Sequence, residues 1–123
     1  MSSGFHLTLF DGEDCGGNDP EAYVDSWDDI GIKKTLPVDA NDFIISVIPD
    51  AGCTCTIKLH HSPDGINWAA VTDKNGNAIS FECAGGVCTC KPITVSLLQY
   101  VKVEAGDASS IKGVVIKLHY TTF

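Results

Sequence analysis

The chain is predicted to fold as an all-β protein, a single antiparallel β-sandwich or jelly-roll-like domain. Short apolar-alternating segments recur along its 123 residues, tight-turn sequences separate them, and no segment keeps a helical hydrophobic period beyond a turn or two. A chain of this length can build one hydrophobic core. We therefore expect two packed sheets, with a strand order that the sequence does not reveal.

Residues 1–35 are expected to differ in kind from the rest. A short alternating strand opens the chain, and an acidic, glycine-rich stretch follows it. Low local hydrophobicity and like-charge repulsion predict an N-terminal acidic arm that is ordered mainly by contact. The alternative is an ordinary first strand of the sandwich followed by a solvated loop. The candidate partner-binding residues of this segment are Phe5, Leu7, Leu9, Phe10, Asp11, Glu13 and Asp14.

Residues 36–123 are predicted to form the sandwich domain. The apolar run at 43–48 suits a buried strand, and 53–61 alternates, with Ile57 and Leu59 on one side. Further strands are expected at 66–72, 78–83, 93–97, 100–105 and 114–120. In the last of these, the residues expected to face inward are Val114, Ile116, Leu118 and Tyr120.

Two turn sequences are expected to connect these strands. The Ser-Pro-Asp-Gly sequence at 62–65 predicts a bulged hairpin, because its proline fixes φ, its aspartate caps the turn and its glycine adopts a left-handed conformation. Trp68 follows with a spacing that we interpret as pointing into the core beside Ile66. Asn75-Gly76 is a strong signal for a two-residue hairpin. The residues assigned to the first turn and its core contact are Ser62, Asp64, Gly65 and Trp68.

Negative charge is concentrated near the N-terminus. The chain has 16 acidic residues and 8 lysines, and the acidic residues between positions 11 and 29 have no basic residue among them. They account for the net charge of −8, since the remainder is balanced. Nucleic-acid binding requires a basic surface, which is absent, and no apolar stretch approaches the roughly 20 residues of a membrane span. Neither nucleic acid nor membrane is an expected partner.

The cysteine content is unusual for a chain with this N-terminus. Six cysteines in a short chain are typical of a secreted scaffold, yet the first ten residues lack the basic and apolar regions of a secretory signal. A protein made in the cytosol that functions outside the cell, such as a virion component, would reconcile the two. The disulfide candidates are Cys15, Cys53, Cys55, Cys83, Cys88 and Cys90.

The pairing of these cysteines stays open. If both turns are hairpins, Cys53 and Cys55 lie at one end of the sheet and Cys83 lies near the other. Cys83 could bridge to Cys88 across the short loop between them, and Cys15 could bond a neighbouring chain. Zinc bound by the two Cys-Thr-Cys tripeptides and six reduced, buried thiols are the alternatives.

No enzyme or cofactor signature is present. The chain lacks a Gly-x-Ser-x-Gly elbow and a phosphate-binding glycine loop. The acidic stretch lacks the regular ligand spacing of a calcium loop. His60 and His61 are adjacent on a strand and point to opposite faces, so they cannot bind one metal ion together. We expect neither catalysis nor a cofactor nor a bound metal.

The heptapeptide Ser62-x-Asp64-Gly65-x-x-Trp68, followed by Asn75-Gly76, resembles a pattern common in small β-sandwich virion proteins of tailed bacteriophages. Near their C-termini these proteins carry an aromatic-Val-basic-Val strand, a polar turn and a final apolar strand, which 100–103, 106–110 and 114–120 match here. The resemblance covers residues 42–123. The Cys-Thr-Cys pairs and the acidic N-terminal segment depart from the pattern.

The resemblance implies a capsid decoration, or cement, protein: a structural homo-oligomer made in the host cytoplasm and located on the outer surface of the virion. It would bind the major capsid protein of an assembled shell, through the N-terminal strand and the acidic segment, and stabilise that shell. A trimer or a dimer is expected. The alternatives are a phage tail or head-fibre component and a carbohydrate-binding module, with Trp68, Tyr100 or Tyr120 as stacking platforms.

Overall fold

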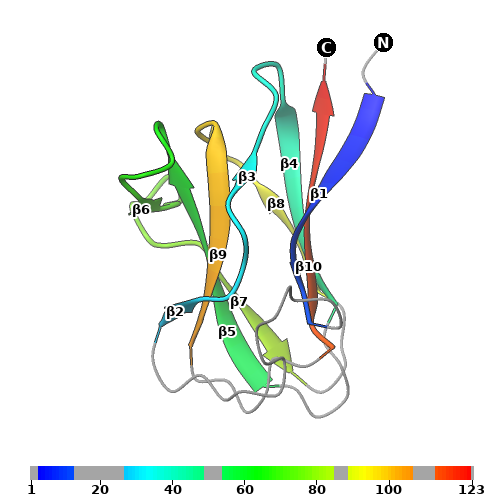
Figure 1. The fold of residues 1–123 in the computed structure, drawn as a ribbon, viewed down its shortest axis with the longest axis vertical. Helices are drawn as coiled ribbons and strands as arrows, with labels where there is room; N and C mark the ends of the chain where they lie inside the picture. The colour runs from blue at the N-terminus through cyan, green and yellow to red at the C-terminus, as the bar shows by residue number, and fades with distance from the viewer. Residues whose placement is uncertain (1–2, 13–26, 49–53, 85–88, 107–112, 123) are drawn as a thin grey trace.

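Two antiparallel sheets face each other across one hydrophobic core in the computed structural model (Figure 1). The structure describes residues 3–12, 27–48, 54–84, 89–106 and 113–122. Within these ranges the chain forms strands and turns and no helix, which confirms the predicted all-β sandwich. Accordingly, the described residues include no apolar helix of membrane-spanning length.

The first sheet has the strand order β1-β10-β4-β8, and every neighbouring pair is antiparallel. Its strands are β1 (Ser3–Asp11), β10 (Val115–Thr122), β4 (Asn41–Ile48) and β8 (Thr89–Ile93). β10 alternates as predicted, with Ile116 and Leu118 fully buried and Lys117 and His119 on the opposite face. Figure 1 shows β1 as the outermost strand of this sheet.

The second sheet is built around β5 (Thr54–Ser62) and β9 (Tyr100–Gly106). β9 also pairs with two short strands, β2 (Asp28–Asp29) and β3 (Lys34–Thr35). β5 pairs on its other edge with β6 (Ala69–Ala70) and β7 (Ser80–Ala84) in succession. All of these pairings are antiparallel, so the sandwich needs no crossover helix.

The core between the sheets consists mainly of β-branched and leucine side chains. Such side chains pack well on a pleated surface, and fully burying one is worth about 1.5–3 kcal/mol. The fully buried members supplied by the long strands include Ile45, Val47, Ile57, Leu59, Val101, Val103, Ile116 and Leu118. The predicted inward positions of Ile57 and Leu59, and of the alternating residues in 114–120, are therefore confirmed.

The described parts of residues 1–35 belong to the sandwich. β1 pairs along its length with β10, and a register shift between Thr8 and Phe10 marks a β-bulge. The bulge lets two consecutive side chains, Leu9 and Phe10, enter the core. This arrangement corresponds to the alternative of an ordinary first strand. Residues 13–26, with Glu13, Asp14 and Cys15, lie outside the described residues.

The turn after β5 forms as predicted up to its glycine. The buried Ser62 Oγ accepts hydrogen bonds from the amides of Asp64 and Gly65 at 3.2 and 2.8 Å. Gly65 has a φ of 76°, a left-handed conformation that a glycine adopts without strain. The Asp64 carboxylate in turn accepts from the amides of Ile66 and Asn67, both at 2.8 Å.

The inward orientation predicted for Trp68 is wrong. Val71 is the fully buried residue of this segment, and Trp68, three residues earlier, falls on the opposite side of the sheet. The Lys102 ammonium lies 4.5 Å from the centre of the Trp68 ring, on the outer face of β9. Ile66, the expected neighbour in the core, is 80% exposed.

The Asn75-Gly76 turn is longer than predicted and does not join two full-length strands. Within the described residues of this turn, only Gly76 has a positive φ, of 83°. A two-residue type I′ turn would require a positive φ at Asn75 as well. The Asp73 amide donates to the Asn77 carbonyl at 2.8 Å, which gives a turn with a glycine bulge. Thr72 and Ala78 then form an isolated bridge, so 72–78 is an excursion from the edge of the sheet.

This excursion corrects the predicted placement of the cysteines. After it, β7 continues along the same edge of β5 that β6 occupied, instead of turning back. Cys83 is therefore opposite Cys55 in the register, and the two do not lie at different ends of the sheet. A second difference concerns the strand predicted at 93–97. It runs from Thr89 to Ile93, and Pro92 is tolerated in it because β8 is an edge strand.

Candidate functional site

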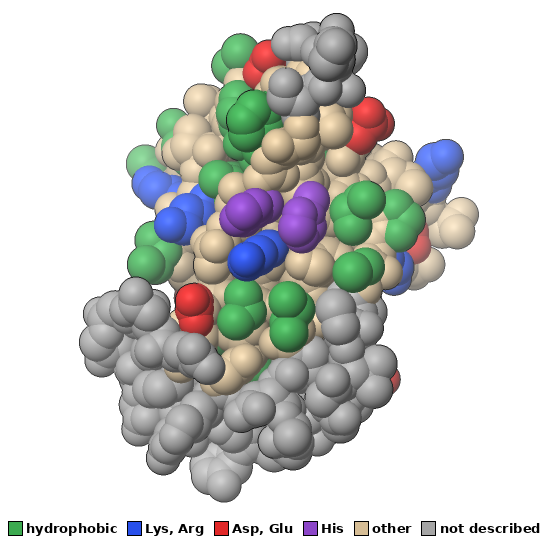
Figure 2. Space-filling view, turned by 90° about the vertical axis from the view of Figure 1, so that its right-hand side faces the viewer, with side chains coloured by type: hydrophobic (Ala, Val, Ile, Leu, Met, Phe, Trp, Pro, Cys, Tyr) green, Lys and Arg blue, Asp and Glu red, His purple; other side chains and the backbone are tan. Residues whose placement is uncertain are grey.

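The outer face of the first sheet is the most distinctive surface of the described residues. Ile44 and Ile48 on β4 project outward and are 44% and 45% exposed. His6 on β1 and His119 on β10 lie in the same cross-strand row as Ile44. Figure 2 shows the two imidazoles together near the centre of this face, with a lysine beside them and hydrophobic side chains around them. We call this surface, made of Ile44, Ile48, His6, His119 and Lys117, the histidine face.

The two imidazoles at the centre of the histidine face are close neighbours. Their ring centroids are 5.8 Å apart, with an interplanar angle of 49°. Partial burial, and then the charges of His6 and Lys117, lower the pKa of His119 below its usual 6.5. This shift favours the uncharged form of the His119 imidazole.

A serine hydroxyl fixes the position of one of these rings. Ser46 Oγ lies 2.9 Å from His119 Nε2, and Ser46 itself is buried between the flanking strands. A serine next to an imidazole is the first element of a nucleophilic site, but such a site also needs an exposed hydroxyl and oxyanion donors. The buried Ser46 does not meet the first requirement, so the contact positions the ring instead.

A shallow hollow of about 290 Å³ adjoins the imidazoles at the end of β1 and β10. Gly4 contributes to it because it has no side chain, and a Cβ built there would meet nothing within 4 Å. At the rim, the rings of Phe5 and Tyr120 stack with centroids 5.6 Å apart. Phe5 is 47% exposed, whereas Tyr120 is buried. The hollow is thus lined by aromatic, imidazole and backbone groups.

Asp42 separates this hollow from a second one. Its φ of 54° is unusual for a residue other than glycine and costs about 1–3 kcal/mol. The strain coincides with a register shift between β10 and β4, and a reciprocal contact holds it in place. Asn41 Nδ2 donates to the Thr121 carbonyl at 3.2 Å, and Thr121 Oγ1 donates to Asn41 Oδ1 at 3.1 Å.

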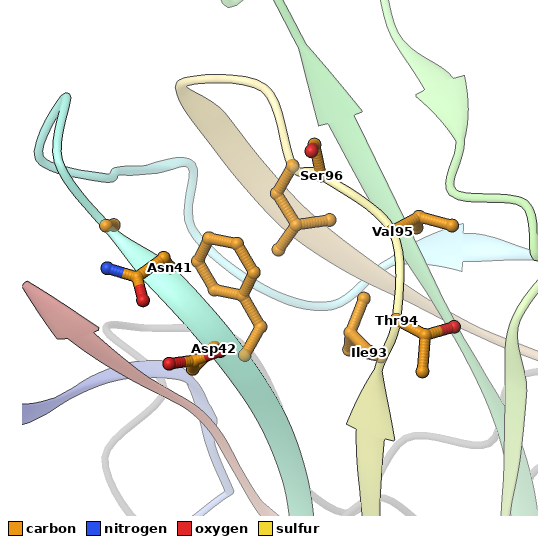
Figure 3. Close-up of a pocket in the computed structure, with 9 residues that line it drawn as sticks. Asn41, Asp42, Ile93, Thr94, Val95 and Ser96 are labelled. Atoms are coloured by element: carbon orange, nitrogen blue, oxygen red, sulfur yellow. The ribbon is translucent and has the colours of Figure 1, made fainter.

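The second hollow, of about 300 Å³, opens where β8 separates from β4 (Figure 3). Asn41 and Asp42 form one wall, and 93–96 form the other. It shares Ala40, Phe43 and Leu97 with a neighbouring hollow of about 270 Å³, which extends to Val38 and Leu98. Val38 is 97% exposed, so this end of the sandwich has an apolar rim.

Several charged side chains on the outer face of the second sheet lie against partners on the same face. Lys58 lies over the Trp27 ring at 4.1 Å, and Lys102 both contacts Trp68 and pairs with Asp29 at 2.9 Å. His60 Nε2 lies 3.0 Å from a carboxylate oxygen of Glu104. Because these groups are paired with one another, this surface differs from the histidine face, whose isoleucines have no comparable cover in the described structure.

The cysteines do not form a described chemical site. Cys90 on β8 is exposed and free. Cys15, Cys53 and Cys88 lie outside the described residues, and Cys55 and Cys83 are described only in their backbone register. Within the described ranges, no three His, Cys, Asp or Glu side chains are close enough together to hold a metal ion.

The predicted partner-binding residues that the structure describes lie in different environments. Phe5 is exposed at the rim of the sandwich and Leu7 is partly buried, whereas Leu9 and Phe10 are core residues that no partner can reach. Asp11 is partly buried at the end of β1.

Sequence reasoning missed the histidine face. The continuous apolar run at 43–48 predicts a buried strand, whereas in the structure the exposed Ile44 and Ile48 alternate with the buried Ile45 and Val47. The sequence does not indicate that His6 and His119 are neighbours, because they lie near opposite ends of the chain. Their proximity depends on the pairing of β1 with β10.

Comparison with known proteins gives no further assignment. No family model, no curated protein and no solved structure matches the chain.

Proposed function

We propose that the protein is a structural virion component, a decoration or cement protein that binds the outer surface of an assembled phage capsid. The observation that carries the proposal is the histidine face, where Ile44 and Ile48 are nearly half exposed on a sheet that is otherwise well packed. Exposed apolar side chains grouped on a rigid surface are characteristic of protein contact sites. The phage-like Ser-x-Asp-Gly-x-x-Trp sequence adds independent support.

In this proposal the chain stabilises the shell without catalysis. Many copies that bind the assembled state, and not the free capsid subunits, shift the equilibrium toward assembly by mass action. The major capsid protein is the proposed partner, and the protein would reach it after synthesis in the host cytoplasm. The acidic residues between positions 11 and 29 would contact basic capsid surface, which makes attachment sensitive to salt.

The test measures binding to empty capsids assembled from the major capsid protein of the phage that, in this proposal, encodes the chain. Ile44→Asp places a charge on the histidine face, and Ile66→Asp makes the same change at an exposed isoleucine of the 62–68 turn. Cosedimentation should show that Ile44→Asp binds roughly tenfold more weakly, a change of about 1.4 kcal/mol, while Ile66→Asp binds like the wild type. Wild-type protein that does not sediment with capsids would overturn the proposal.

Deletion of the N-terminal segment would not test capsid binding alone. Removing residues 1–29 would take away β1 and with it the core side chains of Leu9 and Phe10. Loss of binding by such a variant would report loss of the fold. A point substitution on the outer face avoids this difficulty.

A carbohydrate-binding module is the second candidate, and one observation favours it. Trp68 lies on the outer face of the second sheet, where its ring is partly accessible. Lys102 already covers one side of this ring, and Tyr120 is buried, which leaves a small platform. Binding on a glycan array that Trp68→Ala abolishes would support this function. A tail or head-fibre location would instead be distinguished by immunogold labelling of the virion.

A further inference from the structure

We propose that the outer edge of β1 pairs with β1 of a second copy, in a two-fold antiparallel arrangement that continues the first sheet across both molecules. The inference rests on the proposed function only in requiring a homo-oligomer, and its test needs no capsid. β1 ends the strand order of the first sheet, and no described strand pairs with its outer edge. Among the described strands, β10 is the one that pairs with β1, and an edge strand can form main-chain hydrogen bonds with another chain.

The other described edges carry features that discourage pairing. β8, at the opposite end of the same sheet, contains Lys91 and Pro92. In the second sheet, β2, β3 and β6 have only two residues each, and β7 carries the exposed Glu82. Short length, charge and proline are the usual protections of an edge strand. β1 is nine residues long and contains neither lysine nor proline.

The bulge in β1 limits which residues can pair. Between Ser3 and Thr8 the register with β10 is regular, and it shifts between Thr8 and Phe10. A bulge bends and twists the strand, so the edge beyond it turns away from a flat partner. The segment available for pairing is therefore Ser3 to Thr8, at the end of the molecule where Gly4 and Phe5 line the shallow hollow.

Charge favours a second copy as the occupant. The chain has a net charge of −8, so two copies repel each other over most approaches. From Ser3 to Phe10 there is no acidic residue, and β1 reaches its first one at Asp11. In a two-fold antiparallel pair centred on the Ser3–Thr8 segment, the two Asp11 residues lie at opposite ends. Two copies can therefore pair along this edge without electrostatic repulsion between acidic side chains of the two β1 strands.

The pairing would also join the two histidine faces. His6 lies within the proposed pairing segment, and His119 on β10 and Ile44 on β4 lie in the same cross-strand row. Two copies related by the two-fold axis would place these rows side by side on one continuous outer surface. Both copies of the dimer could then bind the capsid. Once the first copy is bound, the second is held close to the capsid surface, which raises its effective concentration there.

The test is the oligomeric state of the full chain and two charged variants. Gly4→Lys adds an ammonium on the edge strand at a position where a side chain has open space, and Ser80→Lys adds the same charge on β7. Sedimentation velocity should show a wild-type dimer, at least about a tenfold higher dissociation constant for Gly4→Lys, and no change for Ser80→Lys. Circular dichroism should show the same fold in all three.

Hydrogen exchange gives a second readout that does not depend on a variant. Raising the protein concentration should slow exchange of amides within Ser3–Thr8 and leave β8 unchanged. A wild-type monomer at high concentration, or a dimer that Gly4→Lys and Ser80→Lys affect equally, would overturn the inference. A monomer whose capsid binding is lost in Gly4→Lys would assign the edge to the capsid protein instead. A β1-paired dimer that binds no capsid would refute the proposed function alone.

Discussion

His6 and His119 lie opposite each other in the register of β1 and β10, and their ring centroids are 5.8 Å apart on an outward face. They come from the two ends of the chain, so their proximity reports that the first and last strands pair. Two neighbouring imidazoles also place two potential positive charges beside Lys117. From the lowered pKa of His119 we expect the stability of the fold to depend on pH.

We expect the protein to lose stability as the pH falls below about 6.5, the usual pKa of histidine. Burial, followed by neighbouring positive charge, lowers the pKa of His119, and burial with the charge of His60 lowers that of His61. Between the lowered pKa and 6.5 the unfolded chain binds more protons than the folded chain, so acid favours unfolding. Thermal melts from pH 7.5 to 5.5 should show a falling Tm, and His119→Asn should reduce the slope. A Tm that rises over this range would contradict the assignment.

Asp64 should contribute stability that acid removes at lower pH. Hydrogen bonds from the Asn67 and Ile66 amides, from the Asn67 side chain and from Ser62 lower the pKa of its carboxyl below the usual 3.8. The contribution is complete above 3.8 and is lost as the pH falls below it. Asp64→Ala should lower the urea midpoint at pH 7 and flatten its decline in acid. Asp39→Ala, at another exposed aspartate, is the matched control.

Leu59→Ala should destabilise the fold by about 2–5 kcal/mol, because it leaves a cavity between the two sheets. Leu59 is fully buried at the centre of β5 and pairs with Val103. Ile66→Ala, at an exposed position, should change the free energy of unfolding by less than about 0.5 kcal/mol. Chemical denaturation of both variants checks the expectation. Equal effects would mean that the core is not where the structure puts it.

The position of Trp68 predicts a fluorescence change. Lys102→Met removes the ammonium over the Trp68 ring and the ion pair with Asp29, at a cost of about 1 kcal/mol. The emission of Trp68 should change, which is measured in a Trp27→Phe background. A tryptophan buried in the core would not respond. Unchanged emission in Lys102→Met would therefore restore the inward orientation that the sequence suggested.

Gly31 should tolerate no side chain. A Cβ at this position would come within 2.4 Å of the Leu9 carbonyl oxygen, a backbone atom held in β1. Gly31→Ala should destabilise the fold by roughly 1–3 kcal/mol, as overpacking typically does. Gly4→Ala is the control, since a Cβ at Gly4 has open space. Thermal unfolding of the two variants separates close contact from the general effect of replacing glycine.

The sequence correctly predicted the inward faces of strands that have one apolar face and one polar face. β5 and β10 alternate strictly between apolar and polar residues, so their inward faces could be assigned without the structure. The prediction for Trp68 is wrong because it assumes strand alternation from Ile66 onward, whereas β6 begins only at Ala69. The outward isoleucines of β4 were missed because this strand is apolar on both faces.

Local sequence patterns do not predict which distant strands pair with each other. The Cys55–Cys83 register depends on the excursion at 72–78, which a turn signal at Asn75-Gly76 does not distinguish from a full hairpin. The imidazole pair depends on β1 joining β10, which are separated by most of the chain. Such contacts are set by how the sheets assemble, and only a three-dimensional structure reveals them.

The length of the excursion at 72–78 can change without changing the geometry of the sheet. Val71 and Ile79 are joined by a main-chain hydrogen bond of 2.8 Å, so the chain leaves and re-enters the sheet at adjacent points. A peptide inserted beside Gly76 would lengthen the loop without moving β6 or β7, and its closure entropy grows only slowly with length. This tip therefore offers a position where a foreign epitope or an affinity tag can be displayed, and in the proposed capsid-bound state every copy would display it.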